Sequence, residues 1–123
     1  MPSDVAHLRQ AARNAGFLAA LRRRATGSPE WAITVAFYTA VHLVEAHFAR
    51  SQPAVHCRSH TDRLTQVSLR LRPIEAEYWA LYVASRRARY ECAEMSDQEA
   101  AAELETNFEP LRTHLCHLLG IEL

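Results

Sequence analysis

The 123-residue sequence predicts one all-α domain over residues 1–123, a single antiparallel up-down bundle of about five helices. Three observations predict this fold class. Apolar residues recur at helical spacing, and no segment alternates apolar and polar residues as a strand does. Capping residues and prolines separate the helical segments by short connections. Apolar residues make up 49 % of the chain, enough to bury a core without disulfides or metal.

The first two helices are predicted near residues 4–25 and 29–50. Ser3 can cap the first. Ser28-Pro29-Glu30 begins the second with a cap, a proline at the first helical position and an acid in the first turn. The second helix is apolar on almost every side, so we expect it to be the central buried helix. A bundle of this size has little interior to cover such a helix, so we also expect self-association through an apolar face.

The third and fourth helices are predicted near residues 60–72 and 74–93. The third begins at Ser59-His60-Thr61-Asp62, which reads as a capping box. Pro73 ends it, because proline removes a backbone donor and its ring clashes with the preceding turn. The two helices are therefore joined by a very short connection.

The fifth helix is predicted near residues 97–119. It begins at the capping box Ser96-Asp97-Gln98-Glu99 and carries a continuous apolar stripe. Pro110 lies inside it, so we expect a kink near Thr106–Pro110.

Composition bounds the function only loosely. All fourteen basic residues are arginine, and fourteen acidic residues balance them. A biased genome would explain this, and so would phosphate recognition, which suits the planar guanidinium. Three scattered cysteines, the lack of a signal-peptide-like leader and the lack of a membrane-spanning run lead us to expect a cytoplasmic protein with no membrane association.

A line of polar residues interrupts the apolar second helix. Its members lie three or four residues apart and so share one face of the helix: Thr34, Tyr38, His42 and Glu45. Buried polar groups need partners. The line is therefore either an internal hydrogen-bonded network that fixes the packing of the bundle, or one wall of a polar cleft in which His42 titrates near neutral pH.

The fourth helix offers a matching wall. Its polar and aromatic positions at helical spacing are Tyr78, Tyr82, Ser85 or Arg86, and Arg89. Guanidinium groups suit phosphate and phenol rings suit base stacking. The alternative is a solvated arginine cluster that pairs with Glu91 and Glu94. We predict as ligand- or phosphate-binding residues Tyr38, His56, Tyr82, Arg86 and Arg89.

The connection before the third helix gathers reactive residue types, from His56 to Arg63. His60 and Arg63 fall in the first turn of a helix, where free backbone amides attract anions. The candidate catalytic residues are His60, Arg63 and His42. His56, Cys57 and His60 are the types that ligate zinc, but no second pair stands at a usual zinc spacing. We therefore predict no metal site and no cofactor.

Two segments resemble a known family. Phe37-Tyr38-Thr39-Ala40-Val41-His42-Leu43-Val44-Glu45-Ala46 resembles the "FYA…H…A" second helix of HEPN domains. Leu81-Tyr82-Val83-Ala84-Ser85-Arg86-Arg87-Ala88-Arg89-Tyr90 looks like their "LxxLRxxADY" segment. An acidic linker and a long last helix rich in Ala and Glu follow, as in that family. The resemblance covers nearly the whole chain in order and spacing.

The resemblance implies a small helical bundle associated with nucleotide binding and RNA cleavage. It also implies a homodimer and a separate nucleotidyltransferase or antitoxin partner protein. The chain departs from the pattern at Ser85, where the family has arginine, and at Arg89, where it has aspartate. Ribonuclease members carry an arginine, four to six residues and a histidine, a spacing that Arg50–His56 and Arg112–His117 match here.

Three classes of function follow. The first is a nucleotide- or RNA-binding HEPN-like module, as a toxin-type component acting with a partner protein. The second is a metal-independent ribonuclease, in which an arginine stabilises the scissile phosphate and a histidine acts as general base. The third is a non-catalytic helical adaptor whose polar network is purely structural.

Overall fold

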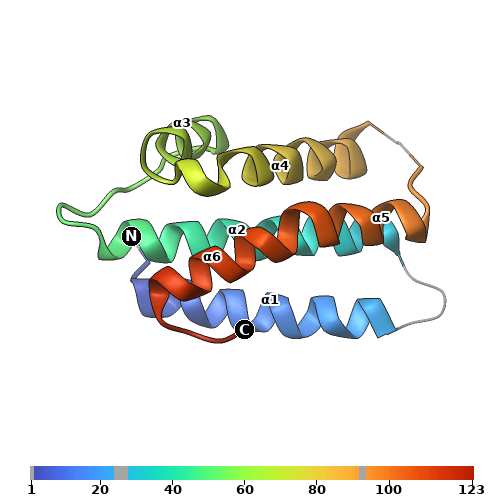
Figure 1. The fold of residues 1–123 in the computed structure, drawn as a ribbon, viewed down its shortest axis with the longest axis horizontal. Helices are drawn as coiled ribbons and strands as arrows, with labels where there is room; N and C mark the ends of the chain where they lie inside the picture. Colours follow the sequence, from blue (N-terminus) through green and yellow to red (C-terminus); the bar gives the residue numbers. More distant parts are fainter. Residues whose placement is uncertain (1, 24–27, 92–93) are drawn as a thin grey trace.

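A computed structural model describes residues 2–23, 28–91 and 94–123, and this part of the chain contains helices and no strands, as predicted. The elements are α1 Asp4–Arg23, α2 Pro29–Arg50, α3 His60–Arg70, a 3₁₀ turn Arg72–Ile74, α4 Glu75–Tyr90, α5 Asp97–Glu103, a π-helical turn Leu104–Phe108, and α6 Glu109–Leu119. Figure 1 shows their order along the bundle. The ends predicted near residues 25 and 93 lie outside the described residues.

The helix α2 occupies the middle of the bundle. It packs against α1, α4, α5 and α6. In Figure 1, α3 and α4 lie above α2 and α6, and α1 lies below them. Antiparallel neighbours joined by short connections give the up-down bundle that the sequence predicts.

Three serines cap helices as predicted. Ser3 Oγ accepts from the Ala6 amide at 3.1 Å, and Ser59 Oγ from the Asp62 amide at 3.0 Å. Ser96 Oγ accepts from the Glu99 amide, also at 3.0 Å. Ser28 stands at the cap of α2 without a side-chain hydrogen bond, so the start of that helix rests on Pro29.

The last helix changes its winding where a kink was predicted. Leu104–Phe108 forms a π-helical turn directly before Glu109 and Pro110. Pro110 has no amide hydrogen for the carbonyl of Thr106, so the regular pattern of hydrogen bonds is interrupted at this point. The turn still buries Leu104 and Phe108 in the core.

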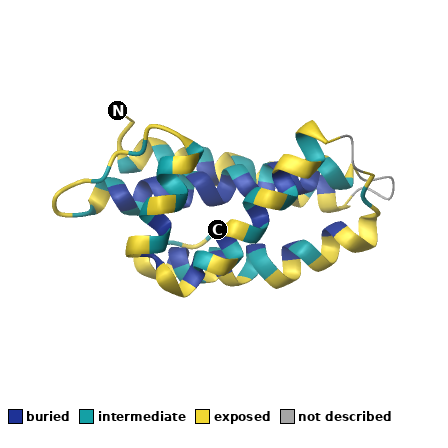
Figure 2. Ribbon diagram, turned by 90° about the horizontal axis from the view of Figure 1, so that it is seen from above, coloured by how far each residue is buried: buried dark blue, intermediate teal, exposed yellow. Residues whose placement is uncertain are grey.

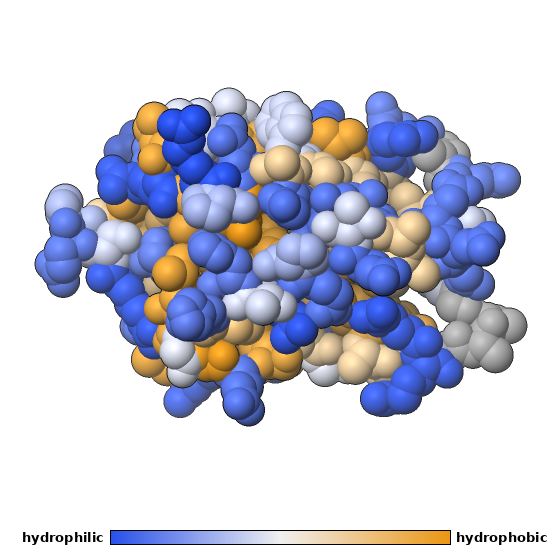
Figure 3. Space-filling model, viewed as in Figure 1, coloured by the Kyte–Doolittle hydropathy of each residue, from blue (hydrophilic) through white to orange (hydrophobic). Residues whose placement is uncertain are grey.

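The apolar surface of α2 is covered by its neighbours. Most of its residues are buried, and burial is concentrated along this helix in Figure 2. The helix is long and apolar enough to cross a membrane, but 72 % of its most apolar window is buried inside the bundle, as in the core helix of a globular fold. On the face that α6 crosses, hydrophilic side chains break up the apolar surface (Figure 3). Because α2 is covered, the expectation of a homodimer rests on the family resemblance.

Candidate functional site

The polar line of α2 is shared among three other helices. Thr34 bonds within its own helix, donating to the Glu30 carbonyl at 2.8 Å. Each of the other three members has its partner on a different helix. Tyr38 pairs with Arg89 of α4, His42 with His7 of α1, and Glu45 with Arg63 of α3. The line therefore both fixes the packing of the bundle and places two of its members beside charged groups of α3 and α4.

The Glu45–Arg63 pair is an almost fully buried ion pair. Arg63 Nε lies 2.5 Å from Glu45 Oε1, and the two side chains are 12 % and 9 % exposed. Arg63 also donates from Nη1 to His60 Nδ1 at 3.0 Å. A guanidinium can only donate, so Nδ1 of His60 must accept and the proton of the neutral ring must lie on Nε2.

The protonation of His60 follows from its surroundings. Burial lowers the pKa of His60, and the positive charges of Arg63, Arg89 and Arg86 lower it further. The imidazole is thus neutral near pH 7, with one N–H left to donate. This arrangement suits hydrogen bonding to an anion better than proton abstraction, which needs an unprotonated nitrogen facing the substrate.

His42 faces α1. Its Nδ1 lies 2.9 Å from Nδ1 of His7, so one ring donates and the other accepts. Burial and the nearby His7, Arg63 and Arg13 lower the pKa of His42 to about 4. His42 is therefore a neutral residue of the α1–α2 contact.

Aromatic rings hold two of the three arginines of α4, Arg86 and Arg89. Arg89 donates from Nη1 to the Tyr38 hydroxyl at 2.5 Å, and its Cζ lies 4.9 Å from the centre of the Tyr90 ring. Arg86 donates to the Tyr82 hydroxyl at 3.3 Å, and its Cζ lies 5.8 Å from the Tyr90 ring centre. Both contacts are within the range of cation–π attraction. The rings orient the guanidinium groups without neutralising them.

The His60 ring completes this group. Its centre lies 6.1 Å from that of Tyr38 and 5.8 Å from that of Tyr82, above the buried ring of Phe37 at 5.6 Å. Three helices thus bring together five side chains that the sequence predicts. We call Tyr38, His60, Tyr82, Arg86 and Arg89 the α2–α4 site.

The site carries uncompensated positive charge. Within the described part of the chain, neither Arg86 nor Arg89 has a carboxylate partner. It is the neighbouring Arg87 that pairs with Glu91, at 4.0 Å. Two guanidinium groups therefore lie about one helical turn apart, and no ion pair among the described residues engages either of them.

Several predicted residues lie elsewhere. His56 is exposed in the connection between α2 and α3, and no hydrogen bond joins it to the site among the described residues. Tyr78 and Ser85 face the core. The arginines of the two Arg–His spacings hold helix ends: Arg50 bonds Asp4 and the Leu119 carbonyl, and Arg112 bonds Glu109 and the Leu123 carbonyl.

The thiol of Cys57 is poorly suited to act as a nucleophile or a metal ligand. Burial and the carboxylate of Glu45 raise the pKa of its thiol to about 11, which disfavours the thiolate needed by a nucleophile or a metal ligand. The described residues contain no group of three or more His, Cys, Asp or Glu that could hold a metal ion.

Two residues of this region were not predicted. His7 is the partner of His42, and the indole of Trp79 stacks on Tyr82 with ring centres 5.9 Å apart. Helical periodicity cannot reveal the first contact, because it joins residues 35 positions apart. Trp79 and Tyr82 are three residues apart on α4, so helical spacing alone would have placed them side by side.

The chain was also compared with known proteins. No family model, no curated protein and no solved structure matches it. The likeness of its second and fourth helices to HEPN domains is therefore an interpretation of the sequence, and the α2–α4 site rests on its own geometry.

Proposed function

We propose that this chain is a nucleotide- or RNA-binding helical module of the HEPN type, and that the α2–α4 site binds a phosphate group. One observation carries the proposal. Arg86 and Arg89 lie one turn apart among aromatic rings, with no carboxylate partner in the described part of the chain. Guanidinium groups bind phosphate through paired, charge-assisted hydrogen bonds.

The other residues of the site supply complementary contacts. His60 has one N–H to donate, because Arg63 occupies its Nδ1. The aromatic rings of Tyr38 and Tyr82 lie beside the two arginines, where the base of a bound nucleotide can contact them. An anion with an aromatic base therefore suits the site better than an inorganic anion does.

Binding is better supported than cleavage. As a ribonuclease, the site would use Arg63 or another arginine for the scissile phosphate and His60 or His42 as general base. However, Arg63 is paired with Glu45, His60 accepts from Arg63, and His42 is paired with His7. The arrangement favours a module that holds its ligand without cutting it.

The test compares two adjacent arginines. Arg86→Ala should weaken binding of a mononucleotide and of a short fluorescent RNA about tenfold or more, as loss of one charge-assisted hydrogen bond does. Arg87→Ala removes the same charge from the same turn but outside the site, so it should leave affinity almost unchanged. Fluorescence anisotropy and calorimetry measure both.

Two outcomes would count against the proposal. Equal losses in the two variants would indicate a nonspecific charge effect. If the wild-type chain binds neither ligand at millimolar concentration, the remaining hypothesis is the helical adaptor, in which the polar network is only structural. Unchanged thermal melting of Arg86→Ala shows that the fold is intact.

The proposal extends to partners. By the family resemblance, the module forms a homodimer and acts as a toxin-type component with a nucleotidyltransferase or antitoxin protein; its few scattered cysteines suit the cytoplasm. Light scattering tests the first part, because a monomer has a mass of 13.9 kDa. A mass that stays at this value at tens of micromolar would exclude the dimer.

A further inference from the structure

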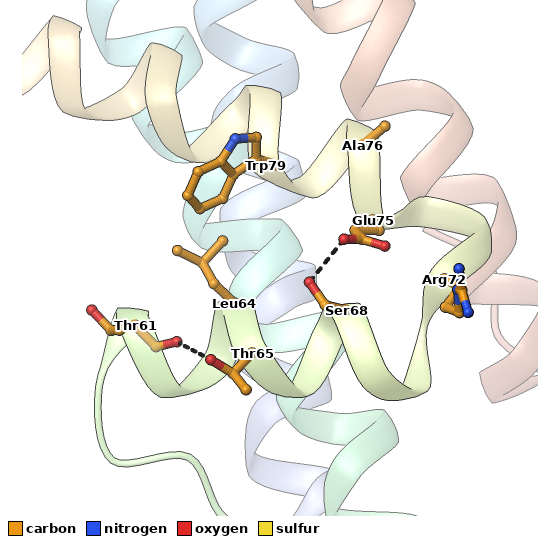
Figure 4. A pocket seen from close by; sticks show the side chains of 8 residues that line it. All are labelled: Thr61, Leu64, Thr65, Ser68, Arg72, Glu75, Ala76 and Trp79. Atoms are coloured by element: carbon orange, nitrogen blue, oxygen red, sulfur yellow. Dashed lines mark hydrogen bonds between the residues drawn. The ribbon is translucent and has the colours of Figure 1, made fainter.

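A groove between α3 and α4 adjoins the α2–α4 site. Its volume is about 570 Å³. In Figure 4, the indole of Trp79 reaches from α4 toward Leu64 of α3, and the polar side chains lie along the rest of the groove. The lining residues are Thr61, Leu64, Thr65, Ser68, Arg72, Glu75, Ala76 and Trp79.

The groove and the site are joined through aromatic contacts. Trp79 stacks on Tyr82 with an angle of 25° between the ring planes, and the Tyr82 ring centre lies 5.8 Å from that of His60. Thr61, the residue after His60, lines the groove itself. A ligand held at Arg86 can therefore continue along α4 into the groove.

The lining has the chemistry of a base-binding pocket. Trp79 is 53 % exposed and offers a stacking face, with Leu64 as the apolar residue opposite. Deeper along α4, Glu75 accepts from the Ser68 hydroxyl at 2.9 Å through Oε1. Its Oε2 has no hydrogen-bond partner among the described residues, so it can accept from a base N–H or amino group.

We propose that this groove binds a nucleobase, and that the ligand is a single-stranded polynucleotide running along α4. The inference rests on the proposed function, because it needs a phosphate at Arg86. An unpaired base has a free face for Trp79 and a free edge for Glu75, whereas bases in a duplex are stacked and paired.

The length of the contact fixes the length of the ligand. Trp79 and Arg86 are seven residues apart on α4, which is about 10 Å along the helix axis. At about 3.4 Å per stacked nucleotide, this distance corresponds to about three nucleotides. A mononucleotide reaches the phosphate site alone, whereas a trinucleotide also reaches the groove.

The first experiment measures affinity against length. Single strands of one to about six nucleotides should bind more tightly up to about three and then level off, and a duplex of the same sequence should bind more weakly. The same measurement with DNA strands of equal length and sequence shows whether the 2′-hydroxyl contributes to affinity. Trp79 fluorescence, followed in a Trp31→Phe background, should be quenched only by the longer strands.

A substitution at Trp79, with a matched control, tests whether the base stacks on this side chain. Trp79→Ala should weaken trinucleotide binding about tenfold and leave mononucleotide binding unchanged. Phe17→Ala is the matched control, since this α1 side chain is also aromatic and 53 % exposed. If mononucleotides bind but neither length nor Trp79→Ala matters, the inference is wrong and the proposed function stands. If no ligand binds, both are wrong.

A second test uses the direction in which affinity changes when an acidic residue is neutralised. Removing an acidic residue near a nucleic-acid site ordinarily raises affinity, because it removes repulsion from phosphate. Glu75→Gln should instead lower trinucleotide affinity several-fold, since it weakens the acceptor for the base. Glu77→Gln, on the same helix outside the groove, should raise affinity or leave it unchanged. A rise for Glu75→Gln would overturn the placement of the base.

Discussion

Arg89 of α4 donates a hydrogen bond to the hydroxyl of Tyr38 on α2, at 2.5 Å, although the two residues are 51 positions apart in the chain. The guanidinium also lies 5.2 Å from the centre of the Tyr38 ring. A single tyrosine thus fixes the position of one of the two arginines of the α2–α4 site and ties α4 to the central helix.

This relationship predicts the effect of removing one oxygen. Tyr38→Phe keeps the ring but takes away the acceptor, so the free energy of unfolding should fall by about 1–2 kcal/mol, as for other charge-assisted hydrogen bonds. Urea denaturation measures the change. Tyr90→Phe is the control, because no hydrogen bond involves that hydroxyl in the described part of the chain. Equal effects would mean that Arg89 does not use the Tyr38 hydroxyl.

The buried ion pair predicts strong non-additivity. Arg63→Met should lower the free energy of unfolding by about 3–5 kcal/mol, because it leaves Glu45 charged, buried and without its partner. The double variant Arg63→Met/Glu45→Leu should recover most of that loss, since no buried charge is left. A double-mutant cycle in urea measures the coupling. Additive losses would show that the pair is solvated.

The His7–His42 contact predicts a loss of stability in acid. The pKa of His42 is about 4 in the folded chain, below its ordinary value of 6.5, so the unfolded chain binds more protons between these values. The stability contributed by neutral His42 is complete above about pH 6.5 and is lost as the pH falls toward 4. The pKa of His7 is lowered as well, mainly by burial, which acts in the same direction.

Thermal melts across this pH range test the prediction. The melting temperature should fall steeply below about pH 6.5, and His42→Gln should flatten this fall by removing the titrating group. Ala54→Ser, a change at an exposed residue that does not titrate, should leave the slope as it is. A wild-type profile that is flat between about pH 7 and 4.5 would contradict the pairing.

The raised pKa of Cys57 predicts low reactivity. With a pKa of about 11, its thiol is almost wholly protonated at neutral pH. In a Cys92→Ser/Cys116→Ser background, the folded chain should react with iodoacetamide at least tenfold more slowly than the chain in urea. Equal rates would show that Cys57 is open to solvent and not depressed in reactivity.

The sequence predicts the fold well because capping residues and prolines mark where several of the helices begin or change their winding. Ser3, Ser59 and Ser96 cap helices through local hydrogen bonds, and Pro110 marks the π-helical turn through a missing donor. All these effects act within a few residues, so the local sequence contains them. No family or structural comparison was needed to find them.

The site was harder to predict because its contacts are long-range. Helical spacing placed Tyr38, His42 and Glu45 on one face, but it could not say that each side chain meets a different helix. The histidines show the consequence. The sequence left His42 between an internal network and a cleft, and in the structure its partner is His7 of α1. Only the position of α3 brings His60 between Tyr38 and Tyr82.

The three pairs formed by the polar line of α2 also have a consequence for how the sequence can evolve. They join residues separated by 51, 35 and 18 positions, so no short segment contains both members of a pair. A substitution at Glu45 would leave Arg63 without its counter-charge until a second substitution, at Arg63, removed the unpaired charge. In descendants of this gene, the members of each pair should therefore be replaced together, and a fragment exchanged between lineages should keep one of these contacts only when it brings both members.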